Sequence, residues 1–63
     1  MTGRQYKKSL KDLSLSINGA GKVLGITSRQ SFRYASGEND IPLTVERLIE
    51  MCKRHGIPEE WLT

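Results

Sequence analysis

The stretch LSINGAGKVLGITSRQSFRYASGE, residues 15–38, carries the end signals of two short helices separated by a three-residue turn. Ser16 precedes the first helix, and its hydroxyl oxygen can accept a hydrogen bond from a backbone N–H group that has no partner within the helix. Gly25 stands where a helix ends in a left-handed residue, a conformation that costs glycine almost nothing. These residues predict a first helix that ends sharply near Leu24.

The second helix of this stretch has its own start and stop signals. Thr27 can cap its N-terminus, and Gln30, three positions later, completes the pattern of a capping box, in which each side chain bonds the other residue's backbone N–H. Gly37 is a plausible end for the helix. Small Gly21 suits a close crossing of the two helices, and their predicted apolar faces contain Ala20, Leu24, Ile26 and Tyr34.

This arrangement of caps, glycine, turn and Gly-Glu exit resembles the helix-turn-helix of the lambda-repressor and Cro-like family over about residues 15–48. The resemblance implies an all-α bundle of four to five helices, with the helix-turn-helix at about residues 16–37. It also implies a second helix, residues 28–36, that enters the DNA major groove. Two positions depart from the family pattern: Ile17 replaces a frequent glutamine, and Ser31 replaces a core aliphatic residue.

The length and composition predict one small domain, residues 1–63, with a modest core. Apolar residues form 37% of the chain and charged residues 27%, which suits a small globular protein. The longest apolar runs have two residues, so the sequence predicts no membrane span and no secretory signal. We therefore expect a cytoplasmic protein, in which the single Cys52 stays reduced and lies in the core.

Charge is distributed unevenly along the chain. Residues 1–36 contain seven basic residues and one acidic residue, a net charge of +6, whereas residues 37–63 have a net charge of −3. An excess of lysine and arginine favours a polyanion as partner, although lysines can also simply keep a small domain soluble. Together with the helix-turn-helix pattern, the charge favours double-stranded DNA.

Apolar spacing predicts two further helices and a final turn. Residues 1–5 show no apolar period, and we expect no fixed structure there. A first helix should begin near Tyr6 and bury Tyr6, Leu10 and Leu13. A last helix should begin at Asp40 or Ile41, with Pro42 in its first turn, and end at His55, burying Val45, Leu48, Ile49 and Cys52.

The second helix of the motif supplies the predicted DNA contacts. We expect base contacts from Ser28, Arg29, Gln30, Phe32 and Arg33, and phosphate contacts from Ser16, Lys22, Ser36 and Asn39. The resemblance matches Ser28, Arg29 and Arg33 to positions that commonly touch bases or phosphates. Capping competes for the Gln30 side chain, and Phe32 either faces a thymine methyl group or turns inward to compensate for Ser31.

The spacing of residues argues against several other kinds of binding site. The glycines around Lys22 lack the Gly and Ser or Thr that a phosphate-binding loop needs, and Leu24 stands where a dinucleotide fingerprint needs glycine. Cys52 and His55 form at most half of a metal site. We therefore predict no enzyme activity, no metal, no cofactor and no small-molecule substrate.

The C-terminal end leaves two roles open. Pro58 begins a further turn that carries Trp61 and Leu62. These two side chains either close the bottom of a small core or form part of an apolar patch that pairs two subunits or binds a protein partner. The predicted function is a sequence-specific DNA-binding transcriptional regulator, and the alternative is an antitoxin-like or partner-binding module that uses the helix-turn-helix as a scaffold.

Overall fold

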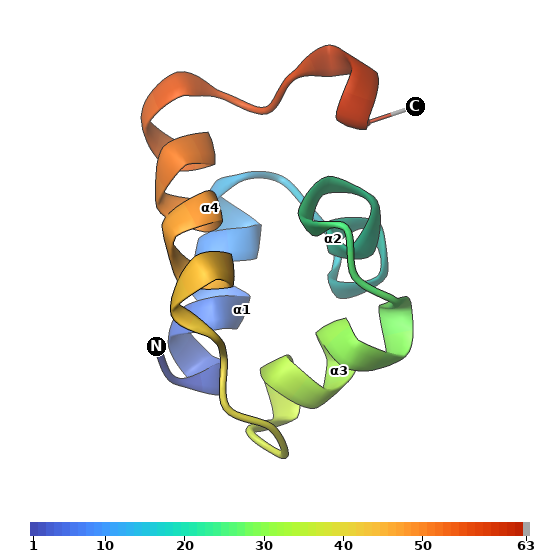
Figure 1. Cartoon of the computed structure of the whole chain (residues 1–63), viewed down its shortest axis with the longest axis vertical. Helices are drawn as coiled ribbons and strands as arrows, with labels where there is room; N and C mark the ends of the chain where they lie inside the picture. The colour runs from blue at the N-terminus through green and yellow to red at the C-terminus, as the bar shows by residue number, and fades with distance from the viewer. Residues whose placement is uncertain (63) are drawn as a thin grey trace.

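Four α-helices and a short C-terminal 3-10 turn make up the computed structural model, which describes residues 1–62 (Figure 1). They are α1 (Gly3–Asp12), α2 (Ile17–Leu24), α3 (Ser28–Ser36), α4 (Leu43–His55) and η1 (Glu59–Trp61). No strand occurs within these 62 residues, which confirms the predicted all-α class. No helix in the described part of the chain is long and apolar enough to cross a membrane.

Helix α1 starts three residues earlier than the sequence predicted. The Thr2 hydroxyl accepts a hydrogen bond from the Gln5 backbone N–H at 3.1 Å, and the Gln5 side-chain oxygen accepts one from the Thr2 N–H at 2.8 Å. This capping box satisfies two donors at the start of the helix. The expectation that residues 1–5 lack fixed structure is therefore wrong for residues 3–5. In addition, the Met1 amino group lies 3.6 Å from the Glu46 carboxylate of α4.

The predicted limits of α2 and α3 are confirmed. The Ser16 hydroxyl accepts a bond from the Gly19 N–H at 2.8 Å, and Gly25 ends α2 in the left-handed region with φ of 70°. The Thr27 hydroxyl likewise accepts a bond from the Gln30 N–H at 3.1 Å. The expected capping box at α3 is only half formed, because within residues 1–62 no return bond joins the Gln30 side chain to Thr27.

Helix α4 begins slightly later than predicted and ends where predicted. Pro42 is the residue before the helix rather than a residue of its first turn, and the last helical residue is His55. Val45, Ile49 and Cys52 are buried and Leu48 is partly buried, as their spacing indicated. Figure 1 shows the chain running from the end of α4 across the bundle towards α2, where η1 lies.

Helices α2 and α3 make the most extensive helix–helix contact of the fold. Gly21 permits it, because a Cβ atom at that position would lie only 2.7 Å from the backbone oxygen of Ile26. Gly3 has the same role between α1 and α3, since a Cβ atom there would lie 2.6 Å from the Ala35 oxygen. The need for glycine at position 21 agrees with the close crossing expected from the sequence.

A buried hydrogen bond joins α1 to α3 in the centre of the core. The Tyr6 hydroxyl lies 2.6 Å from the Ser31 hydroxyl, and both side chains are fully buried. The Tyr34 ring meets the Tyr6 ring edge to face, with a centroid separation of 5.8 Å. Ser31 therefore does not leave a weak place in the core, because Tyr6 supplies both apolar volume and a polar partner for it.

This pair predicts a non-additive response to mutation. Tyr6→Phe and Ser31→Ala each leave one buried hydroxyl without its partner, which should cost about 1–3 kcal/mol of unfolding free energy. The double variant removes both hydroxyls and should lose clearly less than the sum of the two single losses. Chemical denaturation of the four proteins measures the difference. Additive losses would contradict the direct bond.

The Tyr6 hydroxyl also predicts how stability changes at alkaline pH. Burial raises the pKa of this group above its ordinary value of 10.0, and the bond with Ser31 acts in the opposite direction. The folded state thus favours the protonated phenol. Its contribution to stability is complete below pH 10 and is lost as the pH rises through the folded-state pKa.

The comparison of wild type with Tyr6→Phe isolates this effect. Burial also raises the pKa of the Cys52 thiol above 9.0, but that group is present in both proteins. Unfolding free energies measured between neutral pH and pH 11 should fall less steeply for the variant. Parallel pH profiles would show that the Tyr6 hydroxyl does not titrate with unfolding.

Candidate nucleic-acid interface

The outward face of α3 is set by the residues that the helix buries. Ser31, Tyr34 and Ala35 face the core, so the residues on the opposite side of the helix face solvent. Together with the exit of the helix, they line a shallow surface depression made by Ser28, Arg29, Phe32, Arg33, Ser36 and Glu38. Four of the five predicted base-contact residues therefore lie on one surface, which we call the α3 face.

Phe32 lies on the exposed side of α3. Its side chain is 53% exposed, and Ser31 rather than Phe32 occupies the core position. The Tyr6 hydroxyl already fills the space facing Ser31, so Phe32 has no vacancy to enter. Of the two orientations left open by the sequence, the structure selects the outward one.

The α3 face is positively charged. Arg29 is exposed and Arg33 is partly buried, and within residues 1–62 neither guanidinium is held in an ion pair. Glu38 is the acidic residue among those that line the depression, at the exit of α3. Glu38 was not among the predicted contact residues, although it directly follows Gly37, the residue that caps the end of α3.

Gln30 lies apart from the other predicted base contacts. It is partly buried and does not line the depression of the α3 face. At 100° per residue, position 30 is about a quarter turn away from the buried Ser31, on the flank of the helix. Its backbone N–H completes the Thr27 cap.

The predicted phosphate contacts are divided between two places. Ser36 lines the α3 face, but its hydroxyl donates to the Arg33 carbonyl at 3.1 Å and accepts from the Glu38 N–H at 3.3 Å. Asn39 follows in the same loop, is partly buried, and its N–H donates to the Arg33 carbonyl. Ser36 and Asn39 thus help to end α3.

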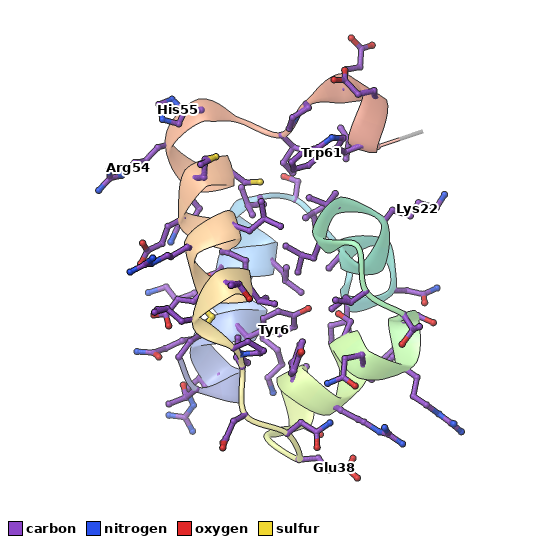
Figure 2. All side chains as sticks on the ribbon, viewed as in Figure 1. Tyr6, Lys22, Glu38, Arg54, His55 and Trp61 are labelled. Atoms are coloured by element: carbon purple, nitrogen blue, oxygen red, sulfur yellow. The ribbon has the colours of Figure 1, made fainter. Side chains whose placement is uncertain are left out.

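The other two predicted phosphate contacts lie on α2. Ser16 caps this helix, and Lys22 is exposed and projects outward from it (Figure 2). Both line a second depression, which also contains Trp61 and Leu62. Figure 2 shows Lys22 and Glu38 at opposite ends of the α2–α3 pair. The contacts predicted for phosphates therefore lie at both ends of the α2–α3 pair rather than gather at one point.

Trp61 and Leu62 remain partly open to solvent. Trp61 is 36% exposed and Leu62 is 51% exposed, and neither belongs to the core cluster. Trp61 also lines an apolar groove at the C-terminal end of α4, together with Leu48, Met51, Cys52, His55 and Ile57. It thus lies between the end of α4 and the start of α2, and it covers the core only in part.

The described residues give little support for a metal site or a reactive cysteine. Among residues 1–62, no group of three or more His, Cys, Asp and Glu side chains is close enough to hold a metal ion. Cys52 is buried, and burial raises the pKa of its thiol, which disfavours the reactive thiolate. The α3 face is therefore the surface with the clearest chemical character.

Comparisons of the chain with protein-family models, with curated proteins and with solved structures find no match.

Proposed function

We propose that the chain is a sequence-specific DNA-binding transcriptional regulator that inserts α3 into the major groove. The observation that carries the proposal is the α3 face, on which Arg29 and Arg33 flank an exposed phenylalanine without ion-pair partners in the described residues. The proposal is also supported by the capped α2, the turn of residues 25–27 and the capped α3, which occur where the resemblance of the sequence to a helix-turn-helix leads us to expect them.

Base recognition in this proposal follows from the chemistry of the exposed side chains. The major groove admits an α-helix, and an arginine guanidinium can donate two hydrogen bonds to O6 and N7 of guanine. Arg29 is in the first turn of α3 and takes this role, while Phe32, one turn on, contacts a thymine methyl group. Arg33 extends the contact to a further base or to a phosphate.

Phosphate contacts hold α3 in place in this proposal. Ser16 and the free N–H groups at the start of α2 form one contact, because the N-terminus of a helix attracts anions. Lys22 adds a positive charge on α2. Ser36 and Asn39 lie at the other end of α3, where the Asn39 side chain is the better donor because the Ser36 hydroxyl is already engaged. Such contacts position the protein without reading the sequence.

Arg29→Ala tests the base contact. The variant should lose about 1–3 kcal/mol of specific binding, roughly a 5- to 150-fold rise in Kd, on a duplex selected from a random library. Binding to an unselected duplex should fall much less. Arg54→Ala is the matched control, since Arg54 is an exposed arginine at the far end of α4 (Figure 2). Fluorescence anisotropy measures the affinity of wild type and of both variants for each duplex.

The possible results separate the roles of Arg29. Equal losses on both duplexes would make it a phosphate contact. An unchanged affinity, or an equal loss in Arg54→Ala, would contradict the assignment of the α3 face as the DNA-reading surface.

A second candidate function is supported by the apolar groove at the end of α4. Met51 and Trp61 are exposed there, beside Leu48 and Ile57, and exposed Leu62 follows on the side of η1 that faces α2. In this alternative the groove binds a protein partner, and the α2–α3 pair is only a scaffold. The same contact between two copies would produce a homodimer, which in proteins of this type places two recognition helices about 34 Å apart.

Trp61→Ala distinguishes an interface from a core role. If Trp61 pairs two chains, sedimentation velocity should show a shift towards monomer. The matched control is Leu43→Ala, which removes an exposed apolar side chain at the N-terminal end of α4, away from the groove. An unchanged sedimentation profile together with a lower thermal stability would assign Trp61 to the core instead.

A further inference from the structure

Helix α1 carries a second set of basic residues, which the proposed function does not use. They are spaced at i, i+3, i+4 and i+7, all of them are exposed, and they form what we call the α1 stripe: Arg4, Lys7, Lys8 and Lys11. Within residues 1–62 none of them is in an ion pair. The acidic residue of α1, Asp12, lies 3.8 Å from Lys53 of α4.

The stripe has no stabilising role that the fold explains. Like charges four residues apart destabilise a helix by a few tenths of a kcal/mol per pair, and the stripe contains two such pairs, Arg4 with Lys8 and Lys7 with Lys11. A bound polyanion would remove this repulsion. The stability of α1 therefore gives no reason for the stripe, whereas a polyanionic ligand does.

The buried Tyr6–Ser31 bond fixes the direction of the stripe relative to the α3 face. At 100° per residue, Lys8 and Lys11 lie roughly opposite Tyr6 on α1, and Arg29 and Arg33 lie roughly opposite Ser31 on α3. Because Tyr6 and Ser31 point at each other, the two basic surfaces point away from each other. A single straight duplex on the α3 face therefore cannot also run along the side of α1 that carries Lys8 and Lys11.

The composition of the stripe favours nucleic acid over a membrane or an apolar protein surface. The exposed residues of α1 are all polar or charged, with no exposed apolar side chain to enter a bilayer or a hydrophobic interface. From residue 4 to residue 11 the helix rises about 10 Å. That length matches about three phosphates of one DNA strand, which are spaced about 3.4 Å apart along the duplex axis.

We propose that the α1 stripe binds the phosphate backbone of a second DNA duplex, so that one chain joins two DNA segments back to back. The α3 face holds the first segment and reads its sequence, and the α1 stripe holds the second without sequence preference. The first contact rests on the proposed function, whereas the second depends only on the charges of α1.

A capture experiment tests the bridge. A selected duplex is fixed to beads, and a fluorescent random-sequence duplex is offered with the protein. Lys8→Gln/Lys11→Gln should retain its affinity for the selected duplex within about threefold, but should capture at least tenfold less of the fluorescent duplex. The control Arg47→Gln/Arg54→Gln removes the same charge from exposed positions of α4 and should capture as wild type does.

Three results would overturn the proposal. Persistent capture by Lys8→Gln/Lys11→Gln would mean that two α3 faces of a dimer hold the two duplexes. An equal loss of capture in the control would mean that total charge alone matters. A tenfold or greater loss of affinity for the selected duplex in the stripe variant would place the stripe in the first interface.

A second measurement separates the stripe from the proposed function. In the background Arg29→Ala/Arg33→Ala, binding to a random-sequence duplex should remain. The negative slope of log K against log salt concentration should become shallower by about 2 when Lys8 and Lys11 are replaced by glutamine. This result is expected even if no selected sequence exists. An unchanged slope, or preferential binding of poly-glutamate over the duplex, would overturn DNA as the ligand of the stripe.

Discussion

The hydrogen bond between Tyr6 and Ser31 is the constraint on which the rest of the structure depends. It joins two helices that are distant in sequence, at a separation of 2.6 Å, inside a core that a chain of 63 residues can only make small. An unpaired hydroxyl at either position would be costly, so the bond fixes the rotation of α3 about its axis. That rotation turns Arg29, Phe32 and Arg33 outward together.

The other contacts of α3 hold it at both ends. Gly21 lets α2 approach closely at the start of α3, and Gly3 lets α1 approach at its end. The α3 face is thus presented by a helix packed on two sides, and a binding surface on such a rigid element loses little conformational entropy when it meets a ligand. Six of the seven acidic residues lie after α3 in the sequence, so the part of the chain from α1 to α3 is strongly basic.

Local signals in the sequence predicted both limits of α2 and α3 and the end of α4, but not the start of α1. Ser16, Gly25, Thr27 and Gly37 mark α2 and α3 because caps act within four residues. The start of α1 was missed because its Thr2–Gln5 capping box lies in a stretch without apolar periodicity. Periodicity alone cannot detect such a cap.

The candidate site was likewise predicted only in part. The residue types of the α3 face could be named from the sequence, but the orientation of Phe32 could not, since it depends on Tyr6 meeting Ser31 across 25 positions of the chain. Gln30 was misjudged as part of a complete capping box, and Glu38 was recognised only as part of the exit from the helix and not of the α3 face. The proposal that α3 reads DNA sequence is tested most directly by binding selection from a random duplex library with the 63-residue chain. An enriched near-palindromic site would support a dimeric reader of DNA sequence, and no enrichment, with only weak salt-sensitive binding, would contradict it.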